Sequence, residues 1–573
     1  MEGKAVLCVL NAKYVHASPA PWCLKAGVRA FAPELDGRVA IVEANINQAE
    51  GDILPRILAH RPAIAGFSCY IWNIEKTLSL CRRLKDALPG VRIVLGGPEV
   101  SYCAADVLRH SPFVDYILAG EGEESFPAFL RALFDGGGDL SPEGAAAVPG
   151  LCMRLPGGGL HISPPCVLNG PVPSPLSAGY AEAVRGRIAY IETSRGCPYR
   201  CAFCLSGGEK PRFFELDACF RALLALSRSG ARTNKFVDRT FNANPERCND
   251  ILRFILDRYG REIPEGARFH FEIAGDILRE ETLALLERFP PGAVQLEIGL
   301  QSFNEETLKA IYRKTDTARL KDNIRRLVAM GNMHIHIDLI AGLPLEDLKS
   351  FAESFNTAYA LGAHHLQLGF LKILHGSAMR KEPDKFPCVF RKSPPYEVVS
   401  TPWLTQEDVR LLHRTENALE KVYNSGRFRL AAEYALSVCG MTPFDFYTAL
   451  GEAVERAGMA RGAALDDFTA LFKDFCERLP HVDGEKLRDA MVRDRLATNP
   501  TGGLPPCLAR HDALFARAVK RLEFHHKPQK GVRRGAAVLY GARALCWADY
   551  DPKMRDPVTG RWPLHEIPLE DVL

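Results

Sequence analysis

Residues 193–204 read Thr193-Ser194-Arg195-Gly196-Cys197-Pro198-Tyr199-Arg200-Cys201-Ala202-Phe203-Cys204 and follow the strand-like run Ile188–Glu192. The cysteines have the spacing C-x3-C-x2-C, and Gly and Pro beside them favour a loop. Three thiolates within eight residues can converge on one metal centre. A four-iron cluster normally takes four cysteines, so three would leave one iron open to another ligand. The alternatives are three unrelated loop cysteines or a zinc knuckle that lacks its fourth ligand.

The cysteine motif stands at the start of a regular series of strands and helices. Because a helical stretch separates each strand-like run from the next, the series predicts a partial (β/α)6 barrel over residues 187–385. The active site of such a barrel lies at the carboxyl ends of its strands. The six runs are Ile188–Glu192, Lys235–Asp238, Phe269–Ile273, Val294–Gly299, His334–Ile340 and His365–Phe370.

Residues 1–140 also alternate between strands and helices, which predicts a parallel, doubly wound, Rossmann-like sheet. Ligands bind such sheets at the carboxyl ends of the strands. Turn chemistry alone would also explain the glycines there. The strand-like runs are Ala5–Leu10, Arg38–Val42, Ala63–Phe67, Val91–Leu95 and Tyr116–Leu118. The candidate ligand contacts are Asn11, Ser68, Gly96, Gly97, Glu99, Gly120 and Glu121.

Two further regions complete the expected α/β organisation. Residues 141–186 are rich in Gly and Pro, which is typical of an inter-domain linker. Residues 386–573 predict a mostly α-helical domain that begins at a capping-box-like turn, Thr405–Asp408. Its expected helices lie near Leu430–Leu450, Leu465–Glu477 and His511–Phe524, and a short β-like run covers Ala536–Tyr540.

Composition favours a reducing compartment and argues against a membrane span. The chain has 17 cysteines in 573 residues, too dilute for a disulfide scaffold, and 72 basic against 69 acidic residues give a net charge of +3. The N-terminus shows no cleavable signal, so we expect a cytoplasmic protein. The uncharged stretch 62–74 is shorter than the roughly 20 residues that cross a bilayer, and the stretch 156–181 is broken by Pro and Gly.

The cysteine motif, placed after the first barrel strand and with an aromatic before its last cysteine, resembles the signature of the radical SAM superfamily. The resemblance implies that Cys197, Cys201 and Cys204 hold a 4Fe-4S cluster, that S-adenosylmethionine chelates the open iron, and that Phe203 lies beside the adenine. It also implies cofactor contacts at the ends of the later strands, at Asp238, Glu272, Glu297, Gln301, Ser302 and Asp338. Ser206-Gly207-Gly208-Glu209 is interpreted as part of the cluster loop.

A doubly wound domain ahead of this barrel resembles the cobalamin-binding radical SAM family. The matching residues are Gly96-Gly97-Pro98-Glu99 and Gly120-Glu121-Gly122-Glu123, so the candidate contacts of the first domain become expected cobalamin contacts. The D-x-H-x-x-G pattern that often supplies a histidine to cobalt is absent. His16, alone on the first loop, is expected to be solvated, which leaves the lower axial face of cobalt with a weaker ligand or none.

The resemblance implies a cobalamin-dependent radical SAM methyltransferase that acts on an unactivated carbon through a 5′-deoxyadenosyl radical and methylcobalamin. Its substrate would be a small molecule or peptide, and its electron donor a protein such as flavodoxin or ferredoxin. The sequence identifies no catalytic side chain. Three alternatives stay open: a non-methylating cyclase or rearrangement enzyme, an RNA methylthiotransferase, and a non-catalytic cobalamin sensor.

Nucleic acid binding has one candidate surface, a basic run near the C-terminus. An exposed helix face whose apolar residues pack inward explains the same pattern, and we prefer this explanation. The run comprises Arg517, Lys520, Arg521, Lys527, Lys530, Arg533 and Arg534.

Overall fold

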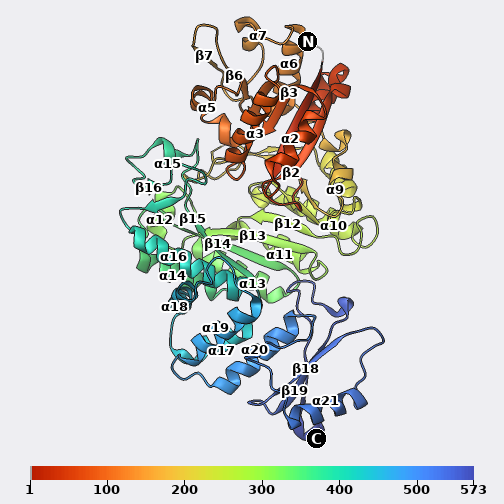
Figure 1. Cartoon of the computed structure of the whole chain (residues 1–573), viewed down its shortest axis with the longest axis vertical. Coiled ribbons are helices and arrows are strands. Elements are labelled where there is room, and N and C mark those ends of the chain that lie inside the picture. Colours follow the sequence, from red (N-terminus) through yellow and green to blue (C-terminus); the bar gives the residue numbers. More distant parts are fainter. Residues whose placement is uncertain (1–2, 209, 573) are drawn as a thin grey trace. The chain divides into compact units, whose positions relative to one another are not determined.

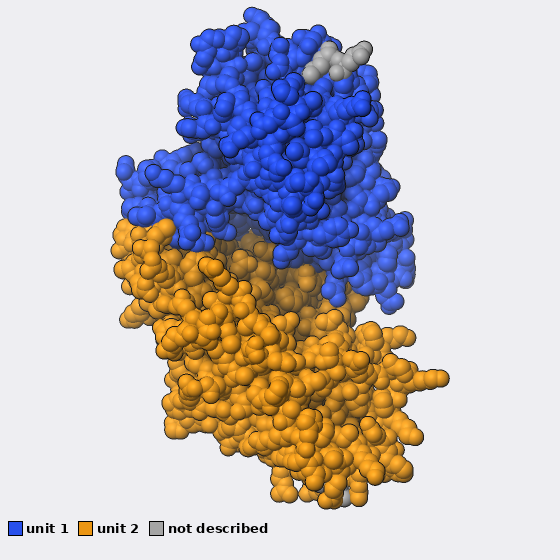
Figure 2. All heavy atoms as spheres, in the orientation of Figure 1, with its two compact units in different colours: residues 1–272, 372–398 blue, residues 273–371, 399–573 orange. Residues whose placement is uncertain are grey.

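The computed structural model describes residues 3–208 and 210–572 (Figure 1). The chain divides into two compact units. Unit 1 comprises residues 1–272 and 372–398, and unit 2 comprises residues 273–371 and 399–573 (Figure 2).

Unit 1 begins with the predicted parallel sheet. Its first five strands are β1 (Lys4–Asn11), β2 (Val39–Asn45), β3 (Pro62–Ser68), β4 (Arg92–Gly96) and β5 (Tyr116–Leu118), and their order in the sheet is β2-β1-β3-β4-β5. The helices are α1 (Ala20–Phe31), α2 (Glu50–Leu58), α3 (Ile74–Ala87), α4 (Pro98–Ser101), α5 (Ala104–His110), α6 (Gly122–Asp135) and α7 (Pro142–Ala146).

Both faces of this sheet are covered, which explains why β1 is buried along almost its whole length. Residues of α2, α3 and α5 belong to one hydrophobic cluster, and residues of α1 and α6 belong to another. The cores therefore lie on opposite sides of the sheet, as the predicted doubly wound fold requires.

The structure differs from the linker interpretation within residues 141–186. Two strands, β6 (Leu151–Arg154) and β7 (Leu160–Ile162), extend the sheet in antiparallel register beyond β5. Leu151, Cys152 and Met153 are buried, so this stretch contributes apolar side chains to the core. The short α8 (Tyr180–Ala183) follows.

The barrel strands follow the predicted series. In unit 1, β8 (Ile188–Ile191), β11 (Thr233–Phe236) and β12 (Phe269–Ile273) pair in parallel, with α9 (Leu216–Arg228) and α10 (Pro245–Arg258) between them in the chain. In unit 2, β13 (Val294–Gln301), β14 (His334–Ala341) and β15 (His365–Phe370) pair in parallel. The connecting helices of unit 2 are α11 (Glu280–Glu287), α12 (Glu305–Ala310), α13 (Thr317–Met330) and α14 (Leu348–Tyr359).

The segment after β15 contains α15 (Ala378–Lys381), β16 (Val389–Phe390) and β17 (Val398–Ser400). The predicted helical region then begins at Thr405, whose side chain and Asp408 form a complete capping box. The helices are α16 (Gln406–Leu419), α17 (Arg429–Cys439), α18 (Pro443–Arg456), α19 (Leu465–Glu477), α20 (Gly484–Thr498), α21 (Ala513–His525) and α22 (Leu569–Val572). The predicted β-run is β18 (Arg534–Leu539), which forms an antiparallel sheet with β19 (Ala544–Asp549) and β20 (His565–Pro568), two strands that were not predicted.

Candidate functional site

The three motif cysteines lie on a loop closed at its base by a short ladder. Strand β9 (Ser194–Arg195) pairs in antiparallel register with β10 (Arg212–Phe213), and the chain between them carries Cys197, Cys201 and Cys204. The backbone N–H of Cys204 donates to the carbonyl of Cys201 at 3.0 Å, and Cys197 forms an isolated bridge with Gly207. The loop thus folds back on itself around the cysteines, and Ser206–Gly208 belong to it as interpreted from the sequence. Glu209 lies outside the described residues.

The surroundings of these thiols fit an iron–sulfur cluster. None of the three forms a disulfide; Cys197 and Cys201 are each 8% exposed, and Cys204 is half-buried. The backbone N–H of Ser206 donates to Cys204 Sγ at 3.4 Å, and Thr240 Oγ1 lies 3.4 Å from Cys197 Sγ. Hydrogen bonds to sulfur stabilise cluster thiolates and tune their potential. The donor set therefore suits a cluster held by three cysteines.

The N-terminal cysteines have a different environment. Cys8, Cys69 and Cys81 belong to a hydrophobic core cluster and are at most 2% exposed. Burial raises the pKa of Cys8 to about 12, and it also raises the pKa values of Cys69 and Cys81 well above the usual thiol value. These side chains stay protonated and behave as small core residues. Unlike the motif cysteines, these three are packed within an apolar core.

Asp238, a predicted S-adenosylmethionine contact, lies beneath the start of the cysteine loop. It is 2% exposed and accepts hydrogen bonds from Thr193 N at 3.0 Å, Thr193 Oγ1 at 2.7 Å and Ser194 Oγ at 2.5 Å. Burial raises the pKa of this carboxyl group, and the bonds from Ser194 and Thr193 oppose the rise. Asp238 therefore fixes the turn from β8 into the loop.

The other predicted cofactor contacts of unit 1 are half-buried. Phe203 lies on the loop between Cys201 and Cys204. Glu272 is on β12, with Oε1 at 3.4 Å from Lys235 Nζ on β11.

In unit 2, Glu297 and Asp338 converge with a histidine that the sequence analysis missed. Glu297 lies opposite His336 across β13 and β14, and His336 Nε2 is 2.8 Å from Asp338 Oδ1. His365 on β15 lies opposite His336, and burial, with the charge of His336 next, lowers the pKa of His365 to about 4. The alternation His-x-His-x-Asp over residues 334–338 was the available signal, because a period of two puts these side chains on one face.

Gln301 and Ser302 lie at the carboxyl end of β13, in different environments. Gln301 adopts a positive φ of 71° beside a register shift in β13. Ser302 is 1% exposed and donates to Glu346 Oε1 at 2.5 Å. Glu346 is completely buried, and burial raises the pKa of its carboxyl group to about 7, although Ser302 and Ser354 donate to it. The hydroxyl group of Ser302 is thus committed to a buried network.

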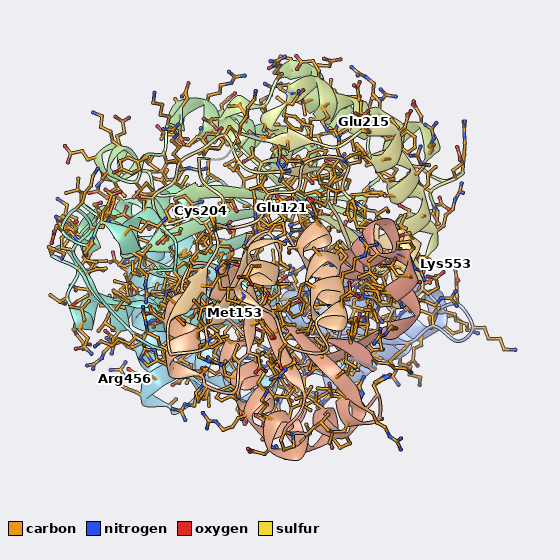
Figure 3. All side chains as sticks on the ribbon, turned by 90° about the horizontal axis from the view of Figure 1, so that it is seen from above. Glu121, Met153, Cys204, Glu215, Arg456 and Lys553 are labelled. Carbon is orange, nitrogen blue, oxygen red and sulfur yellow. The ribbon has the colours of Figure 1, made fainter. Side chains whose placement is uncertain are left out.

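A cavity of about 880 Å³ lies within unit 1. Its lining includes five of the predicted cobalamin contacts, namely Ser68, Gly96, Gly97, Gly120 and Glu121. It also includes Tyr190 and Glu192 at β8, Arg195 and Arg212 at the base of the cysteine loop, and residues 168–176. Glu121 and Cys204 are both labelled in Figure 3. The carboxyl edge of the sheet and the base of the cysteine loop therefore border one space.

Two predicted cobalamin contacts do not line this cavity. Asn11 is 4% exposed, and its Oδ1 accepts from Ser18 N at 3.1 Å. Glu99 is 6% exposed and accepts a hydrogen bond from the hydroxyl group of Tyr396. Both side chains are engaged within the protein.

At two positions on the carboxyl edge of the first sheet, the backbone itself requires glycine. A Cβ atom on Gly97 would lie 2.5 Å from the carbonyl oxygen of Cys69, and one on Gly120 would lie 2.3 Å from that of Cys166. Both glycines have positive φ, 102° and 90°. Close chain packing at positive φ therefore requires glycine at both positions, whether or not a ligand binds there.

His16 makes a specific contact instead of being free in solvent. Its Nδ1 lies 2.6 Å from the Tyr190 hydroxyl, and the two rings are stacked. Burial, followed by the charges of Lys13, Lys235 and Arg187, lowers the pKa of His16. Its ring is thus held by Tyr190, a residue of the cavity wall.

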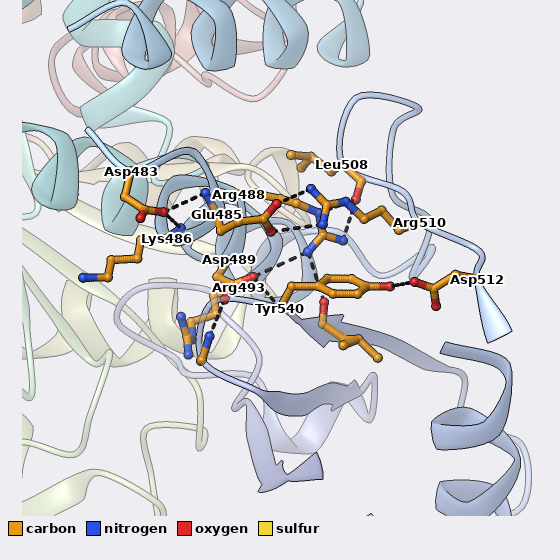
Figure 4. Close-up of polar contacts among 12 residues, drawn as sticks. Asp483, Glu485, Lys486, Arg488, Asp489, Arg493, Leu508, Arg510, Asp512 and Tyr540 are labelled. Carbon is orange, nitrogen blue, oxygen red and sulfur yellow. Dashed lines mark hydrogen bonds and ion pairs between the residues drawn. The ribbon is translucent and has the colours of Figure 1, made fainter. Parts of the chain in front are cut away.

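A polar network in the C-terminal region is structural (Figure 4). Arg488 on α20 is 3% exposed and donates to the carbonyls of Leu508 and Val538 at 2.7–3.1 Å. Asp489 accepts from the backbone N–H groups of Tyr540 and Ala542. These contacts join α20 to β18 and the turn after it. In the basic run, Arg534 pairs with Asp549 at 2.6 Å across β18 and β19.

Comparisons with known families agree with a site built from the first sheet and the cysteine loop. The B12 binding domain matches residues 8–130, the Radical SAM superfamily matches residues 191–358, and a protein family of unknown function, DUF4080, matches residues 384–529. A radical SAM domain implies a 4Fe-4S cluster and S-adenosylmethionine, and a B12 binding domain implies cobalamin. Within residues 3–208 and 210–572, no helix is long and apolar enough to cross a membrane.

Individual relatives of known activity resemble about half of the chain. It is 27% identical over 322 residues to a 2-(S-pantetheinyl)-carbapenam-3-carboxylate methyltransferase of Streptantibioticus cattleyicolor, covering 53% of this chain and 46% of the relative. It is 27% identical to the cobalamin-dependent radical SAM methyltransferase TokK of Streptomyces tokunonensis, covering 55% of this chain and 46% of that protein. The matches thus span about half the length of these relatives. The cobalamin-dependent S-adenosylmethionine radical enzyme OxsB, solved with aqua-cobalamin and S-adenosylmethionine, has the same fold at a TM-score of 0.57 and 14% identity, covering 86% of this chain and 79% of that one.

Proposed function

The chain is a cobalamin-binding radical SAM protein, and on that premise we propose that it is a methyltransferase that acts on an unactivated carbon. The observation that carries the proposal is the cavity of about 880 Å³ in unit 1. Its volume lies within the range of roughly 300–1,000 Å³ usual for ligand sites. The edge where a doubly wound sheet binds ligands and the base of the loop that carries the three cysteines meet at this one cavity.

In this proposal Cys197, Cys201 and Cys204 hold the cluster, and the sheet edge at Ser68, Gly96, Gly97, Gly120 and Glu121 faces cobalamin. When bound, the cofactors supply reductive cleavage of S-adenosylmethionine and a transferable methyl group. The protein contributes placement. Asp238 fixes the turn into the cysteine loop, Ser206 N donates to Cys204, and apolar side chains such as Phe67 and Phe214 shield the cavity from water.

The remaining S-adenosylmethionine contacts stay as proposed from the sequence. Phe203, Asp238 and Glu272 are assigned to it in unit 1, and Glu297, Gln301, Ser302 and Asp338 in unit 2. Ser302 would act indirectly, because its hydroxyl group bonds to Glu346. The geometry of His336 beside Asp338 adds His336 to the candidates.

Substrate and electron donor follow from the same chemistry. Radical SAM enzymes take their electron from an external donor, for which we propose a flavodoxin or ferredoxin. We propose a small-molecule or peptide substrate, and the carbapenam methyltransferase among the relatives supports the small molecule. We propose a cytoplasmic location, in keeping with the abundance of free cysteines.

Product stoichiometry tests the proposal. With substrate, reductant and both cofactors, a methyltransferase should release S-adenosylhomocysteine and 5′-deoxyadenosine in equal amounts, together with a product heavier by one methylene group. Cleavage without substrate is measured separately and subtracted. Formation of 5′-deoxyadenosine without matching S-adenosylhomocysteine would favour the cyclase or rearrangement alternative.

A further inference from the structure

Two arginines stand side by side at the base of the cysteine loop. Arg195 on β9 and Arg212 on β10 are directly paired residues of the antiparallel ladder that closes this loop. Arg195 lies two residues before Cys197. A displacement of either arginine would therefore be transmitted to the backbone that positions the thiols.

Both arginines bind carboxylates of the segment that follows β5. Glu121 forms an ion pair with Arg195 Nη1 at 3.1 Å, and it accepts hydrogen bonds from Arg212 Nη2 and from the backbone N–H of Leu168 at 3.0 Å. Glu123 at the start of α6 accepts from Arg195 Nη2 at 2.5 Å and from Nη1 at 3.4 Å. All four oxygens of the two carboxylates thus receive hydrogen bonds from this chain. We call the group of Arg195, Arg212, Glu121 and Glu123 the loop clamp.

Arg195 and Glu123 form the buried part of the loop clamp, while the side chains of Glu121 and Arg212 are 19% and 38% exposed. The side chain of Arg195 is 15% exposed and that of Glu123 is 5% exposed. Arg195 also donates to Glu192 at the end of β8, at 2.9 Å and 3.0 Å. Burial acts to lower the pKa of Arg195, but its bonds to Glu192 and Glu123 outweigh burial and raise that pKa. Breaking one partner of such a group leaves a buried charge uncompensated, which is costly.

We propose that Glu121 and Glu123 are positioning residues that hold the base of the cysteine loop, so that binding in the cavity and assembly of the cluster are energetically coupled. Glu121, Glu123, Arg195 and Arg212 all line the cavity. A ligand that orders the segment after β5 therefore also orders the loop base, and by linkage an assembled cluster favours that ligand equally. The proposal rests on the proposed function for the identity of the two cofactors.

This inference changes the role expected of Glu121 from the sequence. A carboxylate that pairs with Arg195 and already accepts hydrogen bonds from Arg212 and Leu168 is occupied by the chain and acts on cobalamin through the loop. Glu124, which follows Glu123 on α6, provides a matched control because it is half-buried and carries the same charge three residues after Glu121.

The test is a comparison of hydroxocobalamin affinity with and without the cluster. Absorbance titrations are made on full-length protein, both reconstituted and stripped by chelation, for the wild type, Glu121→Gln, Arg212→Met and Glu124→Gln. In the wild type the cluster should tighten binding by about 5-fold or more, the lower end of usual coupling between sites. Glu121→Gln and Arg212→Met should bring this ratio close to one, while Glu124→Gln should keep it. Ratios equal to that of the wild type in both clamp variants would overturn the inference.

A second readout does not depend on cobalamin. The reduced cluster of Glu121→Gln and Arg212→Met should give an altered EPR spectrum or reduced iron content, while Glu124→Gln matches the wild type. Melting temperatures are recorded in parallel, because a purely structural role would lower stability and leave the EPR spectrum of the folded protein unchanged. Failure of the wild type to bind hydroxocobalamin would count against the proposed function, and the EPR comparison would still decide the role of the loop clamp.

Discussion

The hydroxyl group of Tyr396 donates to the carboxylate of Glu99, although 297 positions separate the two residues in sequence. The bond brings the segment after β15 against α4, and each of the two residues is only 6% exposed. Arg380 lies over the Tyr396 ring, with its guanidinium carbon 5.0 Å from the ring centre. Glu99 is thus a packing residue of unit 1.

Removal of this hydroxyl group should make stability more dependent on pH. Burial raises the pKa of Glu99, and the bond from Tyr396 opposes the rise. Tyr396→Phe should therefore raise this pKa further. Because a raised carboxyl pKa favours the folded state at low pH, the variant should lose stability as pH rises through that pKa. We expect a loss of about 1–3 kcal/mol at pH 8 and a smaller loss at pH 5, measured by urea titration of the full chain.

A suitable control for that variant is Tyr14→Phe, because the Tyr14 side chain is 77% exposed. It should match the wild type at both pH values. Equal stability of Tyr396→Phe and the wild type at pH 8 would contradict the assignment of Tyr396 as the partner that compensates buried Glu99.

The cluster ligands can be tested separately from the other cysteines. Cys201→Ala should abolish the brown 4Fe-4S chromophore and the cleavage of S-adenosylmethionine, because two thiolates do not retain the cluster. Cys388→Ala should keep about four irons per chain after anaerobic reconstitution, since burial raises the pKa of that half-buried thiol. Iron analysis and cleavage assays measure both outcomes. Full cleavage by Cys201→Ala would remove the basis of the cluster assignment.

The sequence predicted the fold through patterns that depend on local physics. Strands such as Phe269–Ile273 and His365–Phe370 have the predicted bounds because apolar runs and turn residues delimit them. The capping box at Thr405 was likewise readable from four residues. Strands β6 and β7 were missed because short strands in a Gly- and Pro-rich segment become stable only by pairing with a distant strand, here β5.

The candidate site was only partly readable for the same reason. The cysteines were found from their spacing, and Ser68 and Gly96 from their place at strand ends. Side-chain partnerships at long range left no local signal, so the bonds of Glu99 to Tyr396 and of Glu121 to Arg212 could not be foreseen. For this reason the sequence predicted Glu99 and Glu121 as ligand contacts, although both side chains bind other parts of the chain.

Glu346 provides a second test of pH dependence, in unit 2. Its pKa is raised from 4.5 to about 7, mainly by burial. Between pH 4.5 and about pH 7, Glu346 is therefore protonated in the folded state but ionised in the unfolded state. The stability of the folded state should fall as pH rises from about 5 to about 8. A shift of this size corresponds to at most about 3 kcal/mol. Glu346→Gln keeps an acceptor for Ser302 without the charge, so the pH dependence should largely disappear.

Glu353→Gln is the control, because Glu353 is an exposed glutamate on α14, the helix that begins two residues after Glu346. It should retain the slope of the wild type in urea titrations between pH 5 and pH 8. If Glu346→Gln also retained that slope, the buried carboxyl group would not be the titrating residue.

Substitutions of three glycines at the carboxyl edge of the first sheet can distinguish what the backbone requires from what a ligand contacts. Gly97→Ala and Gly120→Ala place a Cβ atom within 2.5 Å of a carbonyl oxygen at positive φ, so each should destabilise unit 1 by about 2 kcal/mol or more. Gly96→Ala meets only the Leu118 carbonyl, at 3.5 Å, an ordinary contact. Its stability in thermal unfolding should therefore stay close to that of the wild type.

Gly96→Ala is then the informative variant for the cavity. Because Gly96 lines the cavity and its methyl group can be accommodated by the chain, any loss of hydroxocobalamin affinity must come from the ligand side. We expect weaker binding in absorbance titrations at an unchanged melting temperature, since a methyl group on the rim occupies space that the ligand uses. Gly90→Ala, at a position where a Cβ atom would meet nothing within 4 Å, should bind as the wild type does. Wild-type affinity in Gly96→Ala would show that cobalamin does not approach this part of the sheet edge, and the proposed contacts would then shift toward Ser68 and residues 168–176.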